Sequence, residues 1–133
     1  MSDPPVPPRT PLRARFSTSR HMRLAYWVLL LPPLWAALVL PLPPATFATA
    51  ESYRVMATFG TEQMWALVSA AVFVVGAAGA LIGKAWSVHS ALAVCGTWHI
   101  STALMLFLAN PISIMPGVAV AMAALTLLLA LRI

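Results

Sequence analysis

Four long apolar runs, each without Asp, Glu, Lys or Arg, limit most strongly how this chain can fold. They cover about residues 24–42, 64–82, 86–109 and 112–131. A helix needs about 20 apolar residues to span the hydrocarbon of a bilayer, and each run is close to that length. Only 8% of the 133 residues are charged, whereas a soluble domain carries roughly a quarter. The sequence therefore predicts an all-α integral membrane protein, a bundle of four transmembrane helices.

Prolines interrupt the first and the fourth of these runs. Pro32 and Pro33 stand together in the middle of the first run, and Pro116-Gly117 lies near the start of the fourth. Proline removes a backbone donor and clashes with the preceding turn, so we expect helix one and helix four to be kinked. Inside a membrane, each carbonyl freed in this way needs a donor from another helix or from water.

Two polar residues predict where helices start. Thr61 is a good N-cap for the second run, and Glu62 follows in the first turn, where the helix dipole favours an anion. Asn110-Pro111 has the pattern of an N-cap followed by a first-turn proline. It predicts the start of the fourth helix.

Residues 1–23 form a tail rich in proline and arginine, which we expect to be disordered and cytoplasmic. Its five arginines against the single Asp3 give it a net charge of +4: Arg9, Arg13, Arg15, Arg20 and Arg23. Basic residues beside a membrane helix are attracted to anionic headgroups and hold that end on the cytoplasmic side. We therefore expect contact with lipid and not with nucleic acid.

The remaining charges predict the topology. Lys84 lies in the turn between runs two and three, and Arg132 follows run four. With the N-terminus inside, both residues are cytoplasmic, whereas the loop 45–63, with two glutamates and Arg54, is extracytoplasmic. The predicted domain is thus residues 24–133, with four spans and both termini in the cytoplasm.

Two alternatives remain open in the first third of the chain. The basic tail, the first apolar run and Ala48-Thr49-Ala50 also resemble a signal peptide that is cleaved after Ala50. The loop 45–63 contains apolar residues among polar ones, which fits either an amphipathic segment in the headgroup plane or an ordinary exposed loop.

Small residues recur at helical spacing in the second and fourth runs. They allow close approach of helix backbones, either within one bundle or between copies. The predicted helix-packing residues are Ser69, Gly76, Gly79, Gly83, Gly117 and Ala121.

The third run contains most of the polar atoms. Ser90, Thr97 and Ser101 form a hydroxyl stripe on one side of the predicted helix. Cys95, His99 and Thr102 lie on another side. Because polar groups in lipid need partners, helix three should contact protein or water on both sides.

None of these polar groups indicates a catalytic, metal or cofactor site. Cys95 and His99 are one turn apart, but no third metal ligand is evident, and no acid or second base lies at membrane depth. We expect no enzyme activity, no metal and no cofactor. A proton-coupled carrier of small solutes would have only His89 and His99 as ionisable groups within its spans, with no carboxylate.

The order of several short features resembles small multi-pass membrane proteins of tailed bacteriophages, some of which are labelled holins. These features are Tyr53, Glu62-x-x-Trp65, a glycine-rich second run, Trp98 and Asn110-Pro111, within residues 24–131. The resemblance implies a self-associating, non-enzymatic protein of the bacterial host inner membrane that permeabilises it as a homo-oligomer. The alternatives are a structural or accessory subunit of a larger membrane or virion complex and, third, a small-solute transporter.

Overall fold

The computed structural model describes residues 20–42, 51–112 and 114–132, and these residues form helices and no strand. In chain order the elements are α2 (Arg20–Val39), the 3-10 turn η1 (Glu51–Tyr53), α4 (Arg54–Phe59), α5 (Glu62–Ile82), α6 (Ala85–Ala109) and α7 (Ile114–Arg132). α2, α5, α6 and α7 are each long and apolar enough to cross a membrane. For these residues the prediction of an all-helical fold is confirmed, and so is the prediction of four helices that are long and apolar enough to span a membrane. Arg9, Arg13, Arg15 and the Ala50 cleavage site lie outside the described residues.

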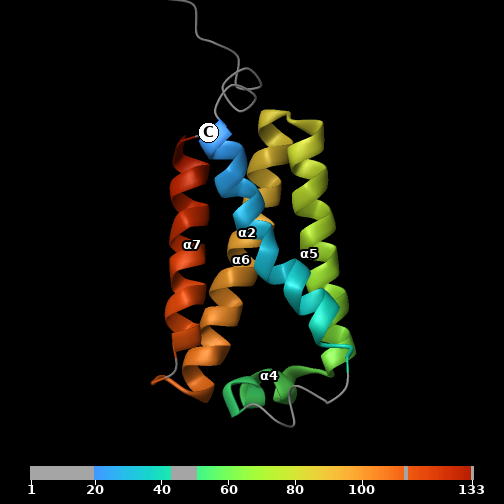
Figure 1. The fold of residues 1–133 in the computed structure, drawn as a ribbon, viewed down its shortest axis with the longest axis vertical. Coiled ribbons are helices and arrows are strands. Elements are labelled where there is room, and N and C mark those ends of the chain that lie inside the picture. Colours follow the sequence, from blue (N-terminus) through green and yellow to red (C-terminus); the bar gives the residue numbers. More distant parts are fainter. Residues whose placement is uncertain (1–19, 43–50, 113, 133) are drawn as a thin grey trace, which may run out of the picture.

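α6 is the central helix of the bundle (Figure 1). It packs against α5 on one side and against α7 on the other, and each pair is joined by a short turn. α2 crosses the bundle at a tilt, from the start near α7 to the end near α5, and most of its contacts are with α5. The bundle core is therefore built where α2 lies over α5 and α6.

Tightly packed side chains from all four long helices form this core. Tyr26, Leu29 and Leu30 of α2 are each at most 2% exposed. The other members of the cluster are Val72, Val88, Ala91, Leu92, Cys95 and Leu129. Many large apolar side chains on the outside remain exposed, for example Leu67, Leu81 and Leu131. That distribution is typical of helices surrounded by lipid.

Two capping residues explain the bounds of α5. The side chain of Thr61 accepts a hydrogen bond from the Met64 amide, at 3.3 Å, as the sequence predicts. At the other end, Gly83 adopts the left-handed conformation with φ of 63°, and its N–H donates to the Gly79 carbonyl at 3.1 Å. Gly83 thus ends the helix and makes the sharp turn into α6.

The start of α7 differs from the prediction. Asn110 caps the C-terminus of α6, and its side chain accepts a hydrogen bond from the Ile112 amide at 3.2 Å within the turn. α7 then begins at Ile114, so Pro116 lies in its first turn. First-turn amides have no partner inside the helix, and proline is tolerated there. Helix formation therefore does not require a kink at Pro116.

η1 and α4 form a short helical segment across one end of the bundle (Figure 1). The indole Nε1 of Trp65 in α5 donates to the Met56 carbonyl at 3.0 Å, and the Met56 side chain is buried. Phe59 and Arg54 are exposed. The segment is therefore anchored on one side and open on the other, as an amphipathic helix is.

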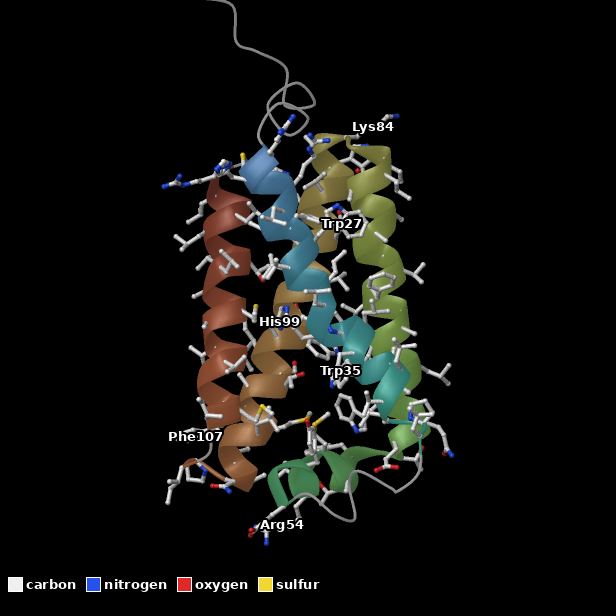
Figure 2. All side chains as sticks on the ribbon, viewed as in Figure 1. Trp27, Trp35, Arg54, Lys84, His99 and Phe107 are labelled. Carbon is white, nitrogen blue, oxygen red and sulfur yellow. The ribbon has the colours of Figure 1, made fainter. Side chains whose placement is uncertain are left out.

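The charged residues divide between the two ends of the bundle. The start of α2, the α5–α6 turn and the end of α7 lie together at one end, which brings Arg20, Arg23, Lys84 and Arg132 to that end. Glu51, Arg54 and Glu62 lie at the opposite end with α4 (Figure 2, where Lys84 and Arg54 mark the two ends).

Candidate functional site

The small residues in the first half of the predicted packing set lie inside the bundle. Ser69 is 1% exposed, and Gly76 and Gly79 are buried on the face of α5 that meets α2 and α6. A Cβ atom on Gly79 would lie 2.5 Å from the Ala91 Cβ and 3.0 Å from the Ser87 carbonyl oxygen. A Cβ atom on Gly76 would collide with the side chain of Leu30. This row therefore brings helices of a single copy together.

A hydrogen bond strengthens this contact between α2 and α5. The phenol of Tyr26 in α2 donates to the Gly76 carbonyl at 2.7 Å. A Cβ atom on Gly79 would lie 3.0 Å from the Tyr26 hydroxyl oxygen, so the missing side chain gives the phenol room beside α5.

The remaining members of the set lie elsewhere. Gly83 is the C-cap of α5 and does not belong to the packing row. Gly117 and Ala121 are exposed on the outer side of α7, and a Cβ atom on Gly117 would meet no atom within 4 Å. One row of small residues therefore packs inside the bundle, and the other lies on its outer surface.

The hydroxyl stripe of α6 lies on the outside of the bundle. Ser90 and Thr97 are exposed and Ser101 is half-buried. Thr97 and Ser101 line a groove between α5 and α6. The Thr97 hydroxyl donates to the Ala93 carbonyl at 2.9 Å, so it keeps an accepting lone pair toward the outside.

The other polar face of α6 holds a backbone carbonyl of α2. Pro33 has no N–H, and the acceptor that this N–H would have bonded four residues earlier is the Leu29 carbonyl. The His99 Nε2 lies 3.1 Å from this oxygen and the Cys95 Sγ lies 3.6 Å from it. A carbonyl only accepts, so His99 carries its hydrogen on Nε2. α6 thus supplies the donors that the proline removed.

The two histidines of α6 are not brought together. His99 is 1% exposed and contacts Leu29. His89 is exposed one turn into the helix, and its Nδ1 lies 2.8 Å from the Ala85 carbonyl. They form no pair that could pass a proton or hold a metal ion between them.

A cavity of about 200 Å³ adjoins His99. Side chains of α2, α6 and α7 line it, together with Ser69 of α5, Tyr53 of η1 and Met56 of α4. Most of the lining is apolar, including Pro32, Trp35 and Leu106. Figure 2 shows His99 and Trp35 on the two sides of the space between α6 and α2.

Two buried donors at this cavity find no hydrogen-bond partner among the described residues. They are the indole Nε1 of Trp98 and the hydroxyl of Thr102, one turn apart on α6. Both residues line the cavity. The Trp98 ring meets the His99 ring edge-on, with centroids 5.1 Å apart, which fixes both rings.

Sequence reasoning grouped Cys95, His99 and Thr102 on one face, and all three are buried. It did not identify the indole N–H of Trp98 as a buried donor. It also did not identify the Leu29 carbonyl as the acceptor for Cys95 and His99. A proline at position 33 together with a histidine on another span was the available signal, but the partner carbonyl depends on how α2 is tilted over α6.

Comparison of the chain with protein-family models, with curated proteins and with solved structures gives no match.

Proposed function

We propose that this chain is a multi-pass protein of the bacterial inner membrane whose copies associate side by side and permeabilise the membrane, as a holin does. Four helices long and apolar enough to cross a bilayer support the membrane location. The resemblance to small phage membrane proteins supports the holin-like activity.

The distribution of charge supports an orientation with both termini in the cytoplasm. Arg20, Arg23, Lys84 and Arg132 lie at one end of the bundle, and both glutamates of the described residues lie at the other. Because basic residues are retained in the cytoplasm, the first end faces inward. There the arginines, together with those of residues 1–19, contact anionic headgroups.

The outward hydroxyl stripe is the observation that carries self-association. In a single copy, Ser90, Thr97 and Ser101 lie on the outer side of α6, where the surrounding side chains are apolar. Polar groups at membrane depth are stable only when they meet protein or water. Copies packed through this side of α6 give the hydroxyls either a partner helix or a water-lined seam.

The outer side of α7 offers a second contact of a compatible kind. Gly117 and Ala121 are exposed one turn apart, so a neighbouring helix can approach the backbone closely. One copy therefore has two different outer faces, on α6 and α7. A copy that uses both can extend an assembly beyond a dimer.

Inducible expression in a bacterium tests the proposal. We expect the membrane potential to collapse once the protein has accumulated, and we expect cross-linked homo-oligomers in the same membranes. Thr97→Val should reduce both. Thr126→Val is the matched control, because the Thr126 hydroxyl donates to the Met122 carbonyl at 2.8 Å but its side chain is buried inside the bundle.

Full membrane potential and viability at high accumulation would contradict the holin-like activity. The second candidate, a subunit of a larger membrane or virion complex, uses the same outer faces with a different protein. Extraction in mild detergent followed by mass measurement distinguishes them. Homo-oligomers support the holin-like assembly, and a stable hetero-complex supports the subunit.

A further inference from the structure

We propose that the cavity between α2, α6 and α7 binds a small apolar molecule that carries a carbonyl oxygen. The inference is independent of self-association, because it concerns the interior of a single copy.

The size of the cavity sets an upper limit on its ligand. Its volume is about 200 Å³. An apolar cavity of about 150 Å³ is large enough to bind benzene. The cavity therefore accommodates one six-membered ring with a few methyl groups, or a short piece of an acyl chain, and nothing as large as a nucleotide.

The two unpartnered donors define the polar part of the ligand. An indole N–H only donates, so Trp98 needs an acceptor, and the Thr102 hydroxyl can donate to the same atom. His99 does not compete for this role, because its Nε2 hydrogen is bonded to Leu29. A buried donor without a partner destabilises the fold, so a molecule that supplies an acceptor is bound favourably. A carbonyl oxygen accepts two hydrogen bonds and donates none, which matches the two donors that line the cavity.

The walls of the cavity can adapt to a ligand. Met56, Met115 and Met122 line it from two different elements, and methionine adjusts its shape at little cost. Met56 belongs to α4, whose hydrogen bond with Trp65 holds the segment across this end of the bundle. The ligand would therefore lie against apolar side chains of the long helices and against Met56 of α4.

Two kinds of membrane molecule combine apolar carbon with a carbonyl oxygen. One is a free ring with carbonyl groups, of the quinone type, and the other is the ester carbonyl of a phospholipid whose acyl chain enters the bundle. Both place an acceptor oxygen near Trp98 and Thr102 and apolar carbon against Leu106 and Ala119.

Duroquinone and durene provide a matched pair of probes for the full-length protein in detergent. Both rings carry the same four methyl groups, and only duroquinone carries carbonyl oxygens. We expect duroquinone to raise the thermal unfolding midpoint saturably and durene to bind at least about fivefold more weakly, as expected for the loss of one or two hydrogen bonds. Equal binding of the two probes would overturn the proposal.

Single substitutions locate the binding. Thr102→Val keeps the side-chain shape and removes the hydroxyl, so it should weaken duroquinone about fivefold and leave durene unchanged. Trp98→Phe should act in the same direction. Thr126→Val and Trp86→Phe are the controls, because neither residue lines the cavity. Ala119→Phe, which fills the cavity, should abolish binding of both probes, whereas Ala124→Phe on the outer side of α7 should not.

Nanodiscs separate the two sources. If a phospholipid ester occupies the cavity, native mass spectrometry should detect lipid retained from diester bilayers and lost from diether bilayers, and that lipid should compete with duroquinone. Duroquinone binding that is equal in both bilayers supports a free small molecule. No saturable shift with duroquinone and no retained lipid would mean that water satisfies the two donors, and the proposal would be wrong.

Discussion

At the scale of single residues, the contact between His99 and the Leu29 carbonyl matters most for the stability of the bundle. Pro33 leaves that oxygen without its helical donor, and His99 and Cys95 of another helix replace it. A polar side chain of α6 therefore replaces the hydrogen-bond donor that α2 lacks at Pro33. This gives an intramembrane histidine a structural role that needs neither metal nor proton transfer.

We expect His99→Ala to lower the free energy of unfolding by about 1–3 kcal/mol, because the Leu29 carbonyl loses its main donor and the core loses a ring. Unfolding by a denaturing detergent measures the change. His89→Ala is the control, and its effect should stay below about 0.5 kcal/mol, since His89 is exposed. Equal losses in the two variants would show that the contact with Leu29 is not what stabilises the fold.

Helical periodicity predicted which residues of α6 share a face but not what each face meets. The grouping of Cys95, His99 and Thr102 follows from 100° per residue, and the structure buries all three. The acceptor that Cys95 and His99 share, the Leu29 carbonyl, lies in another helix. Its identity depends on the tilt and rotation of α2, which side-chain packing sets and which no short motif records.

At the scale of elements, two helices with similar small-residue patterns have opposite roles. α5 turns its glycines inward against α2 and α6, whereas α7 turns Gly117 outward. The pattern alone left packing within the bundle and contact between copies as alternatives. The structure assigns the first role to α5, and the second remains a proposal for α7.

A pair of alanine substitutions separates these roles. Gly79→Ala should destabilise the bundle by about 1–3 kcal/mol, because the new Cβ would meet Ala91 Cβ at 2.5 Å and α5 and α6 must move apart. Gly117→Ala should not destabilise the bundle and should stabilise it by up to about 1 kcal/mol, because nothing lies within 4 Å of the new atom and alanine favours a helix over glycine. Detergent unfolding measures both. Equal tolerance of the two alanines would contradict the inward packing of α5.

One side chain of α5 forms a hydrogen bond with α4. Trp65→Phe keeps most of the ring and removes the donor to the Met56 carbonyl, which lies 3.0 Å from the indole nitrogen. We expect amide hydrogen exchange in residues 54–59 to become about fivefold faster, as expected for a loss of about 1 kcal/mol. Trp86→Phe, an exposed tryptophan, should leave this exchange unchanged. Unchanged exchange in both variants would mean that apolar packing alone holds α4.

At the scale of the whole molecule, the number of spans was the easiest property to predict, because it needs only length and hydropathy. All four long helices agree with the predicted runs to within a few residues. The largest differences are in α2, which begins at Arg20, inside the tail predicted to be disordered, and ends at Val39. The start of α7 differs as well. Asn110 resembles a helix start, yet it ends α6 and forms a turn, since its side chain bonds to the Ile112 amide. The same polar atoms suit both roles, so only the structure distinguishes them.

The proposed orientation gives a direct labelling result. With Cys95 replaced by serine and the protein kept at low expression, a membrane-impermeant maleimide should label Arg54→Cys and Asn110→Cys from outside intact cells. Lys84→Cys and Arg132→Cys should be labelled only after permeabilisation, because they lie at the opposite end of the bundle. The reverse pattern would place the termini outside, and labelling of Lys84→Cys and Arg132→Cys on different sides would exclude four complete spans.

The contact between Leu29 and His99 also has a consequence for biogenesis. The two residues are 70 positions apart, so α2 enters the translocon long before the ribosome has made its donor. During that interval water or another protein has to supply the hydrogen bond to the Leu29 carbonyl, because lipid tails have no hydrogen-bond donor. A chain that ends before His99 lacks this donor, so its first helix should be less stable in the bilayer than the same helix in the full-length protein.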